Sequence, residues 1–363
     1  MVICFSCAAA TKDKLDRLLQ NGGYQDYAAI ISSAIDNLLV LQEHVTRSGS
    51  VILETGSRAV LPQNLGTAHA GLDSAAGSKA PYHSTSEYSG PFAPFEVEGP
   101  PSQLALAPAD TASVGDGSTP DRWIFGQYNK ILPLKVNCRL IARMLHSSPS
   151  GVPLQAVVEV VQQCIPELKL WLEDIDVKHG LEREASVSTG FPTKDSKSLL
   201  RYTNQFILSV NKGGTLSGFP VELGLLNRLD SKGTRLSLTE AGLQFALLSS
   251  PVLDPPRRPQ ERLSTDEVSF LLNHIRLAVP REHAAYRSVL RAIQDGAANP
   301  EKLDAAIHLM VPAGASISNP YLSTQRAGVV SRMSDLGLVS RQREGIRVTY
   351  SLTQKGQDYL HGE

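Results

Sequence analysis

Residues Ser318–Leu360 read SNPYLSTQRAGVVSRMSDLGLVSRQREGIRVTYSLTQKGQDYL, and the order of signals along this stretch decides the fold that we expect. Apolar side chains recur at helical spacing in its first half, and Gly337 follows as a typical helix-ending residue. Arg347–Ser351 alternates as a strand does, and Gly345 suits a tight turn before it. Thr353 can cap a last helix. The stretch therefore predicts a helix, a two-stranded hairpin and a short final helix.

A divergent copy of the same order lies earlier in the chain. The Leu-Gly-Leu element of Leu223–Leu225 recurs at Leu336–Leu338, and the Leu-Thr-x-x-Gly element of Leu238–Gly242 recurs at Leu352–Gly356. Upstream, a Leu-Pro and a Val-Pro pair precede the helical patterns KVNCRLIARML and REHAAYRSVLRAI. Because the order of elements matches as well as the motifs, we expect two related units in the C-terminal region.

The second copy resembles the MarR/PadR-like winged-helix superfamily over roughly the last 45 residues. The resemblance implies a winged helix with a recognition helix over residues 323–336 and a hairpin that contacts DNA. Winged helices also serve as protein docking modules, so the kind of partner stays open at this point. The predicted fold class is mainly α with small β-hairpins (α+β), built from tandem winged helix-turn-helix units.

The side chains that these elements would display favour DNA as the partner. The predicted non-core positions of the helix are Ser323, Thr324, Gln325, Arg326, Ser331 and Arg332, and the hairpin carries Arg341, Arg343 and Arg347. Gln and Arg can reach base edges, whereas Ser and Thr bind phosphates. The alternative is a solvated charged face. The DNA hypothesis requires these five arginines to meet on one exposed surface, and pairing with internal carboxylates would contradict it.

The first copy has a corresponding helix in KDSKSLLRYTNQFIL, which starts at Lys194. The predicted DNA-binding residues of this copy are Lys197, Arg201 and Asn204 on the helix and Lys232 and Arg235 on its hairpin. Glycines and a proline between residues 213 and 220 interrupt the continuous helix that the family pattern expects. Whether this copy binds DNA, or mainly packs or dimerises, therefore stays open.

The N-terminal segment predicts a separate association unit. KLDRLLQNGGYQDYAAIISSAIDNLLVLQ indicates two helices joined at Gly22-Gly23, after a short apolar strand, VICFSC. This order resembles the ribbon-helix-helix superfamily over residues 2–42, which implies an intertwined dimer, since so short a unit has a marginal core alone. The strand lacks side chains for bidentate base contacts, so we expect dimerisation rather than base contact. A helical hairpin that docks elsewhere is the alternative.

Composition divides the rest of the chain. Residues 48–120 are rich in Gly, Ser, Ala and Pro without a sustained period, which predicts a flexible, disordered linker. A proline-rich joint around residues 250–264 divides the remainder. The predicted domains are a ribbon-helix-helix-like segment (1–47), the linker (48–120), a first winged-helix domain (121–255) and a second (262–363).

The charge distribution and the cysteine content bear on the partner and on the cellular compartment. The net charge is −1, but residues 1–120 hold 6 Lys+Arg against 12 Asp+Glu, whereas residues 121–363 hold 29 against 24. The mildly basic C-terminal part suits a polyanionic partner. No apolar run is long enough to cross a bilayer, and no secretory signal is evident. With four cysteines and only one isolated C-x-x-C, at Cys4 and Cys7, we expect a cytoplasmic protein without a metal site.

No catalytic motif accompanies these features. The sequence contains no P-loop, dinucleotide-binding, zinc-protease or nucleophile-elbow motif, and its histidines lie singly in helical patterns. We therefore expect a protein that is not an enzyme and needs no cofactor. The leading hypothesis is sequence-specific binding of double-stranded DNA by a homodimer that regulates transcription. The alternative is a non-catalytic subunit of a larger nucleic-acid or defence assembly, whose winged helices bind a protein partner.

Overall fold

The computed structural model describes residues 16, 53–55, 58–60, 91–97, 99, 104–109, 117–182, 184–210, 216–229, 235–314 and 316–362. Contacts divide the chain into two units, Met1–Lys79 and Ala80–Glu363. In the first unit, β1 (Leu53–Thr55) and β2 (Arg58–Val60) form an antiparallel hairpin. Apart from Asp16, the predicted ribbon-helix-helix segment lies outside the described residues.

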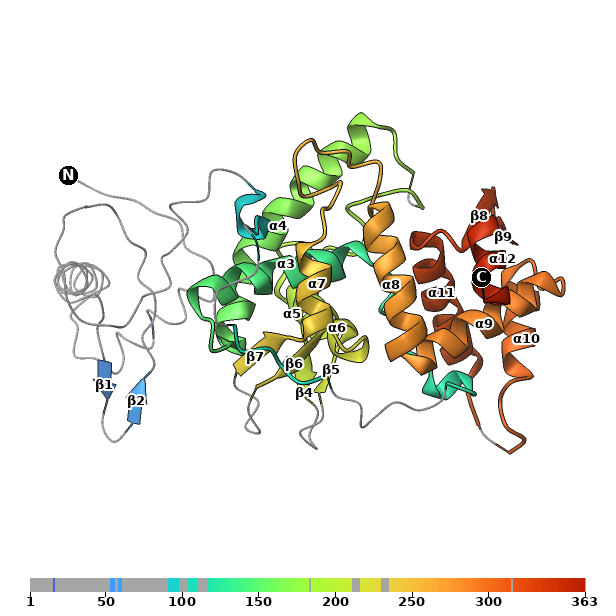
Figure 1. The fold of residues 1–363 in the computed structure, drawn as a ribbon, viewed down its shortest axis with the longest axis horizontal. Helices are drawn as coiled ribbons and strands as arrows, with labels where there is room; N and C mark the ends of the chain where they lie inside the picture. Colours follow the sequence, from blue (N-terminus) through green and yellow to red (C-terminus); the bar gives the residue numbers. More distant parts are fainter. Residues whose placement is uncertain are drawn as a thin grey trace. The chain divides into compact units, whose positions relative to one another are not determined.

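The larger unit begins with a first lobe, residues 132–248, drawn from green to yellow in Figure 1. Its elements are α3 (Leu132–Ser147), β3 (Val152–Pro153), α4 (Leu154–Lys178), α5 (Ser196–Phe206), β4 (Ser209–Val210), β5 (Leu216–Ser217), α6 (Phe219–Glu222), β6 (Leu226–Arg228), β7 (Arg235–Leu238) and α7 (Glu240–Leu247). The short strand β3 pairs with β7, and β7 pairs with β6, so that an antiparallel sheet of order β3-β7-β6 forms.

Helix α3 is the centre of the first lobe. Its sequence is LPLKVNCRLIARMLHS, and the helix is buried around nearly its whole circumference, so other elements must surround it. Leu134, Leu140 and Leu145 are fully buried, and α5, α7 and the sheet pack around the helix. Two charged residues on α3, Lys135 and Arg139, are buried as well.

The second lobe, residues 265–362, is drawn from orange to red in Figure 1. Its elements are α8 (Thr265–Ala278), α9 (Pro280–Gln294), α10 (Pro300–His308), α11 (Asn319–Asp335), β8 (Val339–Glu344), β9 (Arg347–Leu352) and α12 (Gln354–His361). Strands β8 and β9 pair from Val339↔Leu352 to Glu344↔Arg347, and Gly345 takes a positive φ of 61° in the turn between them. The predicted hairpin and the last helix, capped by Thr353, are thus confirmed.

The two predicted copies share their local structure. Thr239 and Thr353 each cap the helix that follows, and each donates a 2.7 Å hydrogen bond to the carbonyl of the Leu-Gly-Leu glycine, Gly224 or Gly337. Both of these glycines have positive φ, 66° and 73°. The last glycine of each Leu-Thr-x-x-Gly element packs against the backbone of the Leu-Gly-Leu element, where a Cβ would lie about 2 Å from a carbonyl oxygen. The repeated motifs therefore form the same corner twice.

The prediction of a disordered linker up to residue 120 is wrong for its C-terminal part. Phe92 and Phe95 are buried beside α3, because these aromatic side chains remove apolar surface from water. The amide of Ala107 donates to the carbonyl of Leu238, so residues 104–109 run along the first lobe's sheet. A short 3-10 helix, Pro120–Arg122, follows. In addition, the two lobes belong to one contact unit rather than to two separate domains.

The described part of the chain is thus a mixed α/β structure, mainly helical, with small antiparallel sheets. None of its helices has the length and apolar character that crossing a membrane requires.

Candidate nucleic-acid interface

Helix α11 contains the predicted recognition helix of the second lobe. It begins at Asn319, four residues before the predicted start, because the Ser318 side chain caps it and Pro320 occupies its first turn. It ends at Asp335, and Gly337 follows with positive φ, as the sequence predicted. The question for function is which of its faces is exposed.

Residues 117–131, here called the covering segment, lie directly across α11. At the crossing, Gly126 and Gly328 approach so closely that a Cβ on Gly328 would lie 2.1 Å from the Gly126 carbonyl oxygen. The Gln325 side chain accepts a hydrogen bond from the Gly126 amide and donates one, of 3.1 Å, to the carbonyl of Pro120. Gln325 is 1% exposed. The prediction that Gln325 is available to a base is therefore wrong.

Arg332 is also buried, and its charge is balanced inside the protein. Its guanidinium pairs with both carboxylate oxygens of Glu282 on α9, at 2.6 and 3.0 Å, and donates to the carbonyl of Tyr128 in the covering segment. Burial acts to lower the pKa of Arg332, but Glu282 outweighs it and raises the pKa above its usual value. Arg332 was predicted to face DNA, and this prediction is wrong because Arg332 joins α11 to α9 and to the covering segment.

The other predicted residues of α11 are half-buried. Arg326 pairs with Asp304 on α10 at 2.7 Å and donates to the hydroxyl of Tyr350 on β9. Ser323 donates to the same Asp304 carboxylate, and Thr324 donates to a carbonyl of its own helix. The Ser331 side chain makes no hydrogen bond to any other residue that the structure describes. These contacts hold α10, α11 and the hairpin together, so the polar groups are already engaged within the lobe.

The hairpin of the second lobe is more open. Arg341 and Arg343 are exposed, but each lies near the Glu184 carboxylate of the first lobe, at 3.4 and 3.6 Å. Arg347 is exposed at the turn. The five arginines therefore do not form one exposed surface, because Arg332 and Arg326 are paired within the lobe. The condition on which a DNA contact by α11 depended is not met.

Helix α5 of the first lobe has the exposed polar face that α11 lacks. Asp195 caps the helix by accepting from the amides of Lys197 and Ser198, at 3.3 and 2.8 Å. Lys197, Arg201 and Asn204 follow at helical spacing on one side and are all exposed. Within the described part of the chain, the Lys197 and Arg201 side chains have no hydrogen bond or ion pair. Their charges are therefore available to a ligand.

An open cavity of about 390 Å³ adjoins this face of α5, between the helix and the covering segment. Its lining includes Phe125, Gln127, Leu200, Arg201 and Asn204. Leu200 is 63% exposed and Phe125 is 38% exposed, so the polar face of α5 has two apolar side chains beside it. Both kinds of group can contact a nucleic acid, since an apolar side chain can meet a thymine methyl group.

The hairpin of the first lobe offers fewer exposed basic side chains than the sequence predicted. The Arg235 guanidinium donates to the carbonyls of Ser150 and Gly151 and to the hydroxyl of Ser148, so it fixes the loop after α3. The prediction that Arg235 is available to DNA is therefore wrong. Lys232 lies outside the described residues.

Sequence analysis missed the covering segment, although one signal for it exists. Gly328 lies inside a helical pattern, where glycine costs about 1 kcal/mol relative to alanine. A glycine at an interior position of a helical pattern can mark a place where another element packs closely. The partner, Gly126, lies 202 residues earlier, beyond the reach of any local pattern.

Within the described ranges, no group of three or more His, Cys, Asp or Glu side chains could hold a metal ion. The comparisons with known proteins add no relative: no family model, no curated protein and no solved structure matches the chain.

Proposed function

We propose that both lobes are winged helices and that the chain binds double-stranded DNA through α5 of the first lobe. The order α3, β3, α4, α5, β6, β7 supports the winged-helix assignment of this lobe, since β3 pairs with β7 and only the short elements β4, β5 and α6 are inserted before β6. In that order α5 occupies the place of the recognition helix. The second lobe repeats the order, with Tyr350 of β9 donating its amide to Ala298 in place of the first strand.

The observation that carries the proposal is the exposed face of Lys197, Arg201 and Asn204, whose side chains have no hydrogen bond or ion pair to any described residue. Arginine and asparagine make bidentate contacts with guanine and adenine, and lysine neutralises phosphate. In this proposal α11 is a structural helix, whose polar residues hold the covering segment in place. Sequence-specific regulation of transcription by a homodimer follows as an expectation. A dimer would place two α5 helices about 34 Å apart, or a multiple of it, on a palindromic site.

The test is the binding of genomic duplex fragments by the full chain. Bound fragments are retrieved, sequenced and used for fluorescence anisotropy between low and moderate salt. We expect log affinity to fall by about 0.9 per log unit of salt for each phosphate contact. The variant Lys197→Ala/Arg201→Ala should bind far more weakly, with a shallower salt dependence. Lys302→Ala/Lys355→Ala removes the same charge from exposed positions of the second lobe and is the matched control.

Two outcomes would contradict the proposal: no retention of DNA, or equal affinities of the two double variants. A specific observation favours a second candidate function in that event. Leu200 and Phe125 are exposed beside α5, and exposed apolar groups at a protein surface suit a protein partner. A non-catalytic interaction subunit would keep its partner at high salt, and Leu200→Asp would release that partner.

A further inference from the structure

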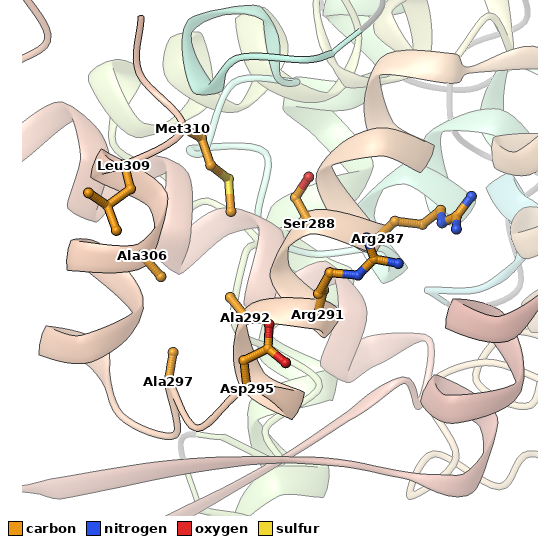
Figure 2. Close-up of a pocket in the computed structure, with 9 residues that line it drawn as sticks. All are labelled: Arg287, Ser288, Arg291, Ala292, Asp295, Ala297, Ala306, Leu309 and Met310. Carbon is orange, nitrogen blue, oxygen red and sulfur yellow. The ribbon is translucent and has the colours of Figure 1, made fainter. Parts of the chain in front are cut away.

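A second cavity lies in the second lobe, away from α5, between α9 and α10. It has a volume of about 430 Å³, within the usual range for small-molecule sites. Figure 2 shows Arg287 and Arg291 extending from α9 on one side, with Ala306, Leu309 and Met310 on the other. Ala292 and Ala297 also line it. The hollow exists because three of its lining side chains end at Cβ, where larger apolar residues would fill the space.

The two arginines of this cavity differ from those elsewhere in the lobe. Arg326 and Arg332 have carboxylate partners, whereas Arg287 and Arg291 have no hydrogen bond or ion pair in the described part of the chain. They lie one turn apart on α9, so both guanidiniums can approach one ligand. Asp295, the remaining charged residue of the lining, follows one turn later and forms no ion pair with Arg291. The lining therefore carries a net charge of +1.

The nearby titratable groups agree with an uncompensated positive charge. The pKa of His283, one turn before Arg287 on α9, is lowered first by burial and then by the charges of Arg287 and Arg276. The Tyr359 hydroxyl lies 2.8 Å from Nδ1 of His283, and Glu282 precedes His283 on α9. Glu282 is occupied by Arg332, so it does not neutralise the α9 arginines.

The opposite wall is apolar and open to solvent. Leu309 is 85% exposed at the end of α10, and Met310 follows it. A methionine side chain adapts its shape to different apolar groups, because it is unbranched and flexible. An apolar body placed against this wall would remove Leu309 and the alanines from water, which is favourable in proportion to the area covered.

We propose that this cavity binds a small amphipathic carboxylate, with its carboxylate on Arg287 and Arg291 and its apolar body against Leu309, Met310 and the alanines. Guanidinium groups bind carboxylates through paired hydrogen bonds of matching geometry. The net charge of +1 suits a monoanion, and Asp295 would repel a second negative charge. The site is independent of α5 and of its proposed DNA ligand.

The test compares 4-phenylbutanoate with its neutral analogue, 4-phenylbutanamide, in titrations of the full chain followed by calorimetry and ligand-observed NMR. We expect saturable binding of the acid, and binding of the amide weaker by about tenfold or more, because the charged hydrogen bonds are lost. Arg287→Ala/Arg291→Ala should weaken the acid to a similar degree. Lys302→Ala/Lys355→Ala again removes the same charge elsewhere and should bind as wild type.

A second variant tests the cavity itself. Ala306→Leu fills the hollow with an apolar side chain and should abolish binding of the acid, while the arginines stay in place. Thermal unfolding checks that this variant is folded. If it is not, Arg287→Ala/Arg291→Ala, which changes only exposed residues, still tests the proposal. Absence of saturable binding by the acid, equal binding of the amide, or wild-type affinity of both variants would overturn the proposal.

Discussion

Gly328 shows how a single residue reports on the packing of α11. In an exposed helix, replacing glycine by alanine is stabilising by about 1 kcal/mol. Here the new Cβ would lie 2.1 Å from the carbonyl oxygen of Gly126, which belongs to a backbone and cannot move aside cheaply. The gain in helix propensity and the steric contact have opposite effects on stability. The contact dominates, because overpacking of this kind costs about 1–3 kcal/mol.

We therefore predict that Gly328→Ala lowers the free energy of unfolding by about 1–3 kcal/mol, measured by urea denaturation. Ala327→Gly, at the neighbouring exposed position, measures the helix propensity alone and should cost about 1 kcal/mol. Both variants are destabilised if the covering segment lies on α11. A Gly328→Ala protein more stable than wild type would show that the two backbones do not meet.

The buried ion pair between Glu282 and Arg332 leads to a second prediction at the residue scale. Glu282→Gln leaves the Arg332 guanidinium buried without a countercharge, and losing one member of a buried pair typically costs 3–5 kcal/mol. We expect a loss of about this size in urea denaturation. Glu282→Gln/Arg332→Met removes both charges and should recover part of it. A single-variant loss below about 1 kcal/mol, as for a surface pair, would contradict the buried pairing.

At the scale of elements, helices α5 and α11 should respond in opposite ways to loss of an arginine. Arg326→Ala breaks the contacts to Asp304 and Tyr350, so we predict lower stability and unchanged DNA affinity. Arg201→Ala removes an exposed side chain, so we predict unchanged stability and a loss of about 1–3 kcal/mol in binding to the preferred sequence. Anisotropy and urea denaturation on both variants measure the two quantities. A loss of DNA affinity in Arg326→Ala, with unchanged affinity in Arg201→Ala, would indicate that α11 rather than α5 binds DNA.

The element scale is also where sequence analysis succeeded most. The end of α11 before Gly337, the strand β9 and the Thr353 cap follow from local rules, because each depends on neighbouring residues. The faces of the helices could not be predicted in the same way. Which side of α11 is covered depends on residues 117–131, and a polar residue such as Gln325 looks the same in sequence whether it meets water, DNA or a buried backbone.

At the scale of the whole molecule, two ion pairs of α3 connect the first lobe to the second lobe and to the joint between them. Lys135 of α3 lies 2.9 Å from Glu267 of α8, and both side chains are fully buried. Arg139, one turn further along α3, pairs at 2.6 Å with Asp254 in the proline-rich joint. The sequence did not indicate these contacts, because charged residues in a helix usually lie on its exposed side. The joint is therefore a packed connection between the lobes.

The Lys135–Glu267 pair makes the stability of this unit depend on pH. Burial lowers the pKa of Lys135 from 10.5 to about 8, although Glu267 acts in the opposite direction. Between these two values the unfolded chain holds a proton that the folded chain has released. The unfolded state then binds more protons, so the free energy of unfolding must rise with pH. Burial raises the pKa of Glu267, although the Lys135 charge acts in the opposite direction.

We therefore predict that, from pH 8 to 9.5, the contribution of Lys135 to stability increases by at most about 1.4 kcal/mol per pH unit. The measurement is urea denaturation of wild type and of Lys135→Met/Glu267→Gln, which removes both charges and keeps a similar volume. Other groups titrate equally in the two proteins, so their difference isolates the pair. The free energy of unfolding of wild type, relative to that of the variant, should increase as the pH rises. Parallel curves would mean that Lys135 keeps its ordinary pKa, and hence that water reaches the contact between α3 and α8.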